Sequence, residues 1–476
     1  MNPFESRIED VKKLIAEVPA RIASRYCIFP LAKEKGRLQL AIPPDLVRSA
    51  QEEIYVLLGK EIDFHLMPKQ EIRQCLLDFY GLSAEVVETL AQNQPGPAET
   101  PEEDTIDLRQ NEDASISRLV NDLILDALSK RASDIHIEPF ENVLRVRYRI
   151  DGLLHETKMG EKIKVLAPHL ISRIKVLAKL DIGEKRLPQD GRIKIRSASA
   201  EIDLRLSVLP SFYGEALAIR ILKPLELLSL QELGFEDSSR DEIQKLLKKA
   251  YGMILLTGPT GSGKTTTLYS CLKILNQVER KIITIEDPIE YQIPGVLQMQ
   301  VNTKTGFTFA SALRSILRHD PDCIMVGEIR DTETVKMAFQ SALTGHLVFS
   351  TLHTNDAASA LTRLLEMGLE PHLIASVLEA VIAQRLVRKF CPLCKGEKSG
   401  GCPQCQGTGF YGRTVIYEIL ILNEALRDSM TRNRSGSFLR RQAAEQGMLT
   451  FRDCARQKLE GKITSPEEME RVISPE

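Results

Sequence analysis

The octapeptide Gly-Pro-Thr-Gly-Ser-Gly-Lys-Thr at 258–265 is the part of the sequence best suited to chemistry. An apolar run precedes it and a helical pattern follows it, which is the strand–loop–helix context of a phosphate-binding loop. The glycines let backbone N–H groups close around phosphates, and the helix N-terminus adds partial positive charge. Lys264 can reach the β- and γ-phosphates, and the Thr265 hydroxyl can ligate Mg²⁺. We predict that ATP and Mg²⁺ bind at Gly258, Pro259, Thr260, Gly261, Ser262, Gly263, Lys264, Thr265 and Thr266.

Two glutamates are candidates to position the water that attacks a bound nucleotide. Glu286 and Glu328 each end an apolar run that predicts a strand. The carboxyl ends of parallel strands line one ligand crevice, so both side chains are expected near the loop. Gly327 stands where the second motif of such sites usually has Asp, so Mg²⁺ would depend more on Thr265, water and Glu328. Either glutamate alone would be a solvated strand end, but beside the loop we predict both, with Lys264, to be catalytic.

Four cysteines form two Cys-x-x-Cys pairs separated by seven residues, Cys391 with Cys394 and Cys402 with Cys405. Two such pairs supply the four thiolates that tetrahedral Zn²⁺ favours. A redox site needs only one pair, and free buried thiols would not repeat the spacing. We therefore predict a structural zinc module at 391–412 with no open coordination position. The other five cysteines are scattered and are expected to be buried thiols in a reducing compartment.

The composition limits the classes of protein to which the chain can belong. Its 476 residues predict about three domains, and a hydrophobic content of 43% can fill several cores although Trp is absent. Lys and Arg number 63 against 65 acidic residues, which gives no bulk attraction to nucleic acid or anionic lipid. No apolar run approaches the roughly 20 residues of a membrane span. The first residues lack a hydrophobic signal core, which predicts a cytoplasmic protein.

Periodicity and composition divide the chain into six parts of an α/β protein. One part is acidic, carries three prolines and is predicted to be a flexible linker. Strands that alternate with helices predict a parallel sheet covered on both faces. The predicted parts are a small N-terminal domain at 1–91, the linker at 92–113, an α/β domain at 114–224, a nucleotide-binding core at 225–390, the cysteine module at 391–412 and a charged helical region at 413–476.

Two arginines stand on the polar side of strands in the predicted domain at 114–224. Arg205 and Arg220 each alternate with apolar residues, so both face outward. Periodicity alone favours ordinary surface arginines at these positions.

Further segments carry a family likeness. They are TIEDPIE at 284–290, LRSILRHDPDCIMVGEIRD at 313–331, TGHLVFSTLHTND at 344–356, SDIHIEP at 133–139 and EKRLPQDGRI at 184–193. Together with the phosphate loop, they resemble the GspE/PilB group of secretion ATPases, which includes type II secretion system protein E. The resemblance covers about residues 114–460, while the first 90 residues resemble more loosely a shortened partner-docking domain.

The resemblance implies an α/β fold with a RecA-like P-loop NTPase core and a PAS-like domain at 114–224, with nucleotide between the two. It implies that Arg205 and Arg220 are activating arginines, which can neutralise charge on the γ-phosphate. It also implies subunit or domain contacts by Arg314, Arg318 and Arg330. His346 and His353 either sense nucleotide or bridge domains, or are satisfied core histidines.

The resemblance further implies a homo-hexamer that powers pseudopilus assembly and protein export in type II secretion. Its partners would be an inner-membrane recruiter, bound through residues 1–91, and a platform protein, so that the ATPase reaches the membrane only through them. One alternative is a type IV pilus extension ATPase. A RecA-like nucleic-acid motor is a second alternative, and the balanced charge argues against it. A third is a scaffold that binds ATP but scarcely turns it over.

Overall fold

The structure is a computed structural model that describes residues 14–34, 36–82, 84, 105–107, 116–160, 163–196, 201–222, 228–397, 402–432 and 436–473, with the backbone alone at 105–107, 431, 432, 436 and 437. The chain divides into two compact units, Met1–Pro224 and Leu225–Glu476. Among the described residues, none of the helices combines the length and the apolar character needed to cross a bilayer.

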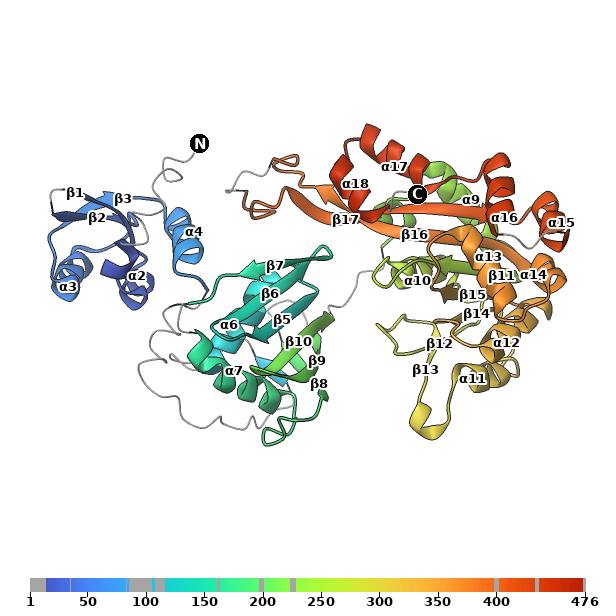
Figure 1. Ribbon diagram of the computed structural model, residues 1–476, viewed down its shortest axis with the longest axis horizontal. Helices are drawn as coiled ribbons and strands as arrows, with labels where there is room; N and C mark the ends of the chain where they lie inside the picture. The colour runs from blue at the N-terminus through green and yellow to red at the C-terminus, as the bar shows by residue number, and fades with distance from the viewer. Residues whose placement is uncertain are drawn as a thin grey trace. The chain divides into compact units, whose positions relative to one another are not determined.

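A small α/β domain opens the first unit (Figure 1). Its three-stranded sheet has the order β1-β2-β3, in which β1 and β2 are antiparallel and β2 and β3 are parallel. Apolar side chains such as Leu38, Leu40 and Ile62 are fully buried under the helices. The elements are α2 (Ala20–Tyr26), β1 (Phe29–Glu34), β2 (Arg37–Ile42), α3 (Arg48–Leu58), β3 (Ile62–Leu66) and α4 (Lys69–Phe79).

The rest of the first unit is a seven-stranded sheet with the order β4-β8-β9-β10-β5-β6-β7. Side chains alternate between the two faces of β6: Leu144, Val146 and Tyr148 are buried and the arginines between them are not. The two helices of this domain, at 116–129 and 163–177, pack on the apolar face of the sheet (Figure 1). The elements are β4 (Thr105–Asp107), α6 (Ile116–Ser129), β5 (Asp134–Pro139), β6 (Leu144–Ile150), β7 (Leu153–Thr157), α7 (Ile163–Leu177), β8 (Gln189–Arg196), β9 (Glu201–Ser211) and β10 (Gly214–Leu222).

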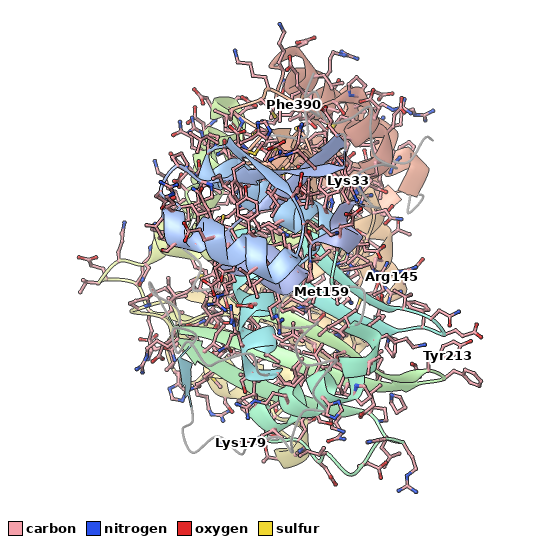
Figure 2. All side chains as sticks on the ribbon, turned by 90° about the vertical axis from the view of Figure 1, so that its left-hand side faces the viewer. Lys33, Arg145, Met159, Lys179, Tyr213 and Phe390 are labelled. Carbon is pink, nitrogen blue, oxygen red and sulfur yellow. The ribbon has the colours of Figure 1, made fainter. Side chains whose placement is uncertain are left out.

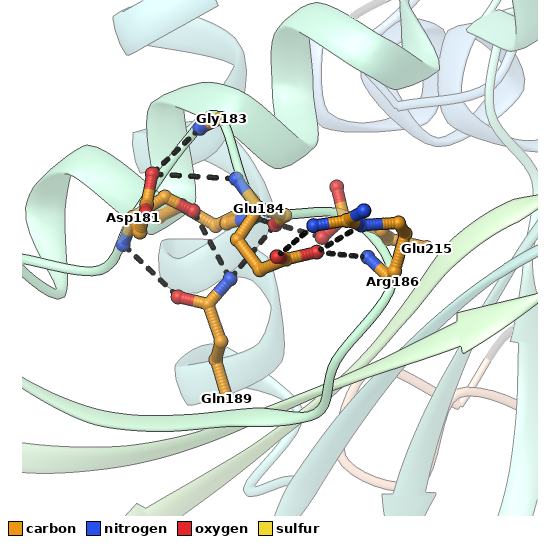
Figure 3. Close-up of polar contacts among 7 residues, drawn as sticks. Asp181, Gly183, Glu184, Arg186, Gln189 and Glu215 are labelled. Atoms are coloured by element: carbon orange, nitrogen blue, oxygen red, sulfur yellow. Dashed lines mark hydrogen bonds and ion pairs between the residues drawn. The ribbon is translucent and has the colours of Figure 1, made fainter.

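The loop at 181–189 runs from the connection after α7 to the first residue of β8, and it is held by its own side chains (Figure 3). Asp181 Oδ1 accepts from the N–H groups of Gly183 and Glu184, at 2.8 and 3.3 Å. The Glu184 carboxylate accepts from the backbone and the guanidinium of Arg186. Gln189 donates to the carbonyls of Asp181 and Glu184. The loop is therefore a preformed surface feature.

The turn between β9 and β10 exposes two aromatic side chains, Phe212 and Tyr213. Phe212 is 93% exposed, and its ring meets that of Tyr213 edge to face with 5.0 Å between the centroids. Figure 2 shows Tyr213 projecting from the edge of the unit.

The second unit is built on a sheet with the order β13-β12-β14-β15-β11-β16-β17, with helices on both faces (Figure 1). All neighbours are parallel except the long antiparallel pair β16 and β17. Its strands and helices are α8 (Leu230–Leu233), α9 (Asp237–Leu247), β11 (Gly252–Thr257), α10 (Lys264–Leu275), β12 (Ile282–Glu286), β13 (Leu297–Gln300), η1 (Thr303–Thr305), α11 (Phe309–Ile316), β14 (Cys323–Val326), α12 (Thr332–Leu343), β15 (Leu347–Leu352), α13 (Ala357–Glu366), α14 (Pro371–Val377), β16 (Leu378–Phe390), β17 (Phe410–Ile421), α15 (Glu424–Arg432), α16 (Gly436–Glu445), α17 (Phe451–Glu460) and α18 (Pro466–Val472).

The structure departs from the sequence prediction at two segments. The first residues of the helical region at 413–476 belong to β17, because the run VIYEIL at 415–420 is buried throughout, and periodicity cannot tell such a run from a buried helix. Within the predicted linker, β4 pairs in parallel with the end of β8. The other linker residues lie outside the described part of the chain.

Candidate functional site

The phosphate-binding loop connects the fully buried strand β11 to helix α10. Gly258, Gly261 and Gly263 all have positive φ values, of 144°, 79° and 89°. A Cβ at position 258 would lie 2.4 Å from the backbone oxygen of Gln384, so only glycine fits there. Within the described residues, the N–H groups of Gly261, Gly263 and Lys264 donate to no other protein atom. The loop therefore leaves donors at the start of α10 free for an anion.

Lys264 lies over the loop and is 9% exposed. Its Nζ donates to the carbonyl oxygens of Gly258, at 2.7 Å, and Pro259, at 3.1 Å. Burial lowers the pKa of the Lys264 ammonium, and the nearby charge of Glu328 opposes that shift. The ammonium is thus bonded to the carbonyls of the loop, and the charge of Glu328 helps to keep it protonated.

Glu328 is the strand-end glutamate whose charge acts on Lys264. Its side chain is 14% exposed and forms an ion pair with Arg330. His353 Nε2 lies 3.5 Å from the other carboxylate oxygen. The structure thus brings Arg330 and His353, two residues singled out by resemblance, onto the same carboxylate.

Glu286 has a different environment. Its carboxylate is 3% exposed and accepts hydrogen bonds from the Tyr269 hydroxyl, the Thr284 hydroxyl at 2.6 Å and the Gln298 amide at 3.0 Å. Burial, followed by the bond to Glu286, raises the pKa of Tyr269. Both oxygens of Glu286 are therefore engaged in linking α10, β12 and β13.

Gly327 follows β14 and bonds to the neighbouring strand β12. Its N–H donates to the carbonyl of Ile285 at 2.8 Å. A Cβ at 327 would lie 3.3 Å from the Ile285 carbonyl oxygen and 3.4 Å from Glu286 Cα, so a side chain here would need a small local adjustment. The carbonyl of Gly327 accepts from the Thr351 hydroxyl at 2.8 Å.

Arg205 and Arg220 lie on the first unit, opposite each other on β9 and β10. Arg192 on β8 stands opposite Arg205, which extends the pair to a row of three on one face. Arg220 forms an ion pair with Asp134 at 3.1 Å. Among the described residues, neither Arg192 nor Arg205 has an ion pair. Like charges on directly opposed residues are unfavourable, so this row is suited to receive an anion.

The remaining residues singled out by resemblance contact residues outside the loop. Arg314 forms an ion pair with Glu333, and Arg318 donates to the carbonyl of Arg314 at 2.7 Å. His346 Nδ1 donates to the Ser341 carbonyl at 2.9 Å, as a satisfied structural histidine does.

The four cysteines of the predicted zinc module converge between β16 and β17, and their sulfurs all lie within 4.8 Å of one another. Cys391 Sγ lies 3.7 Å from Cys402 Sγ, and Cys394 Sγ lies 3.5 Å from Cys405 Sγ. Tetrahedral Zn²⁺ with Zn–S bonds of about 2.3 Å needs sulfur separations of about 3.8 Å. The set therefore fits a metal ion better than disulfides, which need about 2 Å.

Sequence reasoning missed four residues of these sites: Tyr269, Gln298, Arg192 and Gln384. Arg192 carried a signal, because it follows the alternation of its strand. The others act through contacts with residues distant in the sequence, so no local pattern indicates them.

This fold and site define a class: a P-loop ATPase with a parallel, RecA-like core and a second α/β domain. The chain belongs to the type II/IV secretion system protein family, whose pattern matches residues 109–471, and residues 5–86 match the MshEN domain. The resemblance deduced from the motifs is thus confirmed, and the chain is an ATP hydrolase.

Individual relatives support this membership. A type II secretion system protein E of Pseudomonas aeruginosa is 41% identical and covers 94% of this chain and 96% of that protein. The type IV pilus assembly ATPase PilB of Myxococcus xanthus is 38% identical, over 97% of this chain and 87% of that protein. The X-ray structure of the Legionella pneumophila ATPase DotB matches with a TM-score of 0.61 at 22% identity, over 78% of this chain and 99% of that one, which shows a shared fold.

Proposed function

We propose that this chain is the ATPase that drives pseudopilus assembly and protein export in type II secretion, acting as a homo-hexamer. The main support is that Lys264, the loop N–H groups without another protein partner among the described residues, and Glu328 occur together at one edge of the parallel sheet. Full-length kinship to a type II secretion system protein E supports the choice of machine.

The residues of the second unit divide the reaction among them. Lys264 exchanges the carbonyls of Gly258 and Pro259 for the β- and γ-phosphates, while the loop N–H groups bind phosphate oxygens. Thr265 would hold Mg²⁺, which supplies charge neutralisation when bound. Glu328 positions the attacking water, and Arg330 and His353 fix the direction of its carboxylate. Glu286 anchors α10 to the sheet.

The arginines of the first unit supply the remaining charge. Arg205 and Arg220 act as arginine fingers when their sheet meets a bound nucleotide. Binding and release of the γ-phosphate would then be linked to motion between the two units, which makes the product of hydrolysis mechanical work.

Two further parts serve assembly. The cysteine module holds one structural Zn²⁺ per chain through Cys391, Cys394, Cys402 and Cys405. Residues 1–91 dock a membrane-anchored recruiter, so the hexamer lies at the cytoplasmic face of the inner membrane through its partners.

The Lys264→Ala variant tests the enzyme assignment in the full chain with saturating Mg²⁺-ATP. We expect turnover to fall to background while circular dichroism and the melting temperature stay close to wild type. Lys273→Ala, which removes an exposed lysine from the same helix, is the matched control and should keep full activity. Turnover that survives Lys264→Ala would remove the assignment.

The Arg205→Ala and Arg220→Ala variants test the proposed fingers. Each should lower kcat by roughly 10³-fold and leave ATP binding nearly unchanged, since the charge they contact develops during transfer. Lys194→Ala, on the same face of β8, is the control. An unaltered kcat in both arginine variants would restrict these residues to a structural role.

Complementation distinguishes the two machines that the relatives represent. Expressed in place of a host's own ATPase, the chain should restore export of a secreted enzyme when the host lacks its secretion ATPase. Restoration of pilus extension instead would assign the chain to type IV pili, as its kinship to PilB allows.

A further inference from the structure

Gln384 lies on β16 directly behind the phosphate-binding loop. Strand β16 pairs in parallel with β11 up to Ala383, which stands beside Thr257, and then continues under the loop where β11 ends. Gln384 is fully buried. Its backbone oxygen is the atom that excludes a side chain at Gly258, and its amide nitrogen would lie 3.1 Å from a Cβ at Gly263.

Among the described residues, the side chain of Gln384 makes one hydrogen bond, from Nε2 to the carbonyl oxygen of Ser262 at 2.7 Å. The amide oxygen Oε1 is buried and has no hydrogen-bond partner in the described part of the chain. A buried acceptor without a partner costs stability. The glutamine is therefore poorly explained as a stabilising core residue, because an apolar side chain of similar size would avoid that cost.

The geometry of the peptide bond gives this hydrogen bond a function. The Ser262 carbonyl and the Gly263 N–H belong to one planar trans peptide and point in opposite directions. A donor that fixes the carbonyl toward β16 consequently fixes the Gly263 N–H toward the opposite side. That N–H is one of the groups that donates to no other protein atom within the described residues.

We propose that Gln384 is a positioning residue for nucleotide binding: by holding the Ser262 carbonyl, it presets the Gly263 N–H toward the phosphates. The inference rests on the proposed function, since it assumes that phosphates bind in this loop. It adds a residue 122 positions away from the loop to the machinery of the site.

Gln384→Leu in the full chain is the test, with Val387→Ala as control because Val387 is equally buried on β16 and belongs to the hydrophobic core. The loss of one preset donor should weaken binding of ATP and ADP about tenfold, leave kcat within about threefold and leave the weak binding of adenosine unchanged. The melting temperature should not fall, since the unpaired Oε1 is removed as well. Val387→Ala should lower the melting temperature and leave the nucleotide Kd unchanged.

Direct binding of a fluorescent ATP analogue is measured beside turnover, so the two proposals can fail separately. If the wild-type chain bound ATP without hydrolysing it, that result would contradict the proposed function. The role of Gln384 could then still be tested by the nucleotide Kd. An unchanged Kd in Gln384→Leu would overturn the positioning role. A loss of affinity accompanied by a clear fall in the melting temperature would indicate a packing defect and would also overturn the positioning role.

Discussion

The loop at 181–189 and the phosphate-binding loop at 258–263 are both tightly constrained, but they use their polar groups in opposite ways. In the first, backbone N–H groups bond to the loop's own Asp181, Glu184 and Gln189 side chains. In the second, the N–H groups of Gly261, Gly263 and Lys264 donate to no other described protein atom, and the Ser262 carbonyl is fixed from outside the loop, by Gln384 on β16. A loop that must bind an anion keeps its donors available, and the surrounding sheet has to supply the rigidity instead.

A methyl group added to a glycine of each loop should have very different effects on nucleotide binding. Gly258→Ala drives a Cβ to within 2.4 Å of a backbone oxygen at a positive φ, so nucleotide binding should fall by at least about 100-fold, as measured by calorimetry. Gly183→Ala meets only the Asp181 carboxylate at 3.3 Å, and its affinity for ATP should equal that of wild type. Normal binding by Gly258→Ala would contradict the geometry of the loop.

The two strand-end glutamates extend the comparison from loops to carboxylates. Glu328→Gln should lower kcat by about 10²–10³-fold while ATP still binds, since the side chain acts on the attacking water. Glu286→Gln should mainly lower stability, by about 1–3 kcal/mol, because its carboxylate is already hydrogen-bonded to buried donors. Steady-state kinetics and urea unfolding on both variants separate the two roles; the reverse pattern would reassign the catalytic carboxylate.

The buried pair Lys175–Glu215 tests how the loop at 181–189 is held. Lys175 Nζ donates to Glu215 Oε1 at 2.8 Å and to the Glu184 carbonyl at 2.7 Å. Lys175→Ala leaves a buried carboxylate unpaired and should destabilise the first unit by about 3 kcal/mol in urea. The double variant Lys175→Met/Glu215→Leu should recover most of that loss. Nucleotide Kd should not change in either variant.

Acid titration gives the smallest expected effect. Hydrogen bonds from the side chain and backbone of Arg186 lower the pKa of Glu184 to about 2 from its ordinary value of 4.5. The folded pKa is depressed, so the stabilisation is complete above about pH 4.5 and is lost as the pH falls toward 2. The difference in urea midpoint between the wild type and the Glu184→Gln variant should therefore shrink as the pH falls over this range. A constant difference would show that the Arg186 contact is not formed in solution.

Much of the fold followed from the sequence because its signals are local. The apolar runs before the phosphate-binding loop, Glu286 and Glu328 predicted β11, β12 and β14, with the sheet parallel as expected. The hairpin of β16 and β17 was not predicted, because its strands carry long continuously buried runs, at 378–384 and 414–420, in place of an alternating pattern. The cysteine module was located by spacing alone.

By itself, the sequence determined the phosphate-binding loop, the four-cysteine set and the family, since each depends on short segments whose residues are adjacent along the chain. Only the tertiary structure decided how the polar groups are shared. It bonded Glu286 to buried donors, paired Glu328 with Arg330 and His353, placed Arg192 beside Arg205, and set Gln384 behind Ser262. These assignments depend on which strands become neighbours, and a hydrogen bond between distant residues leaves no pattern in either segment.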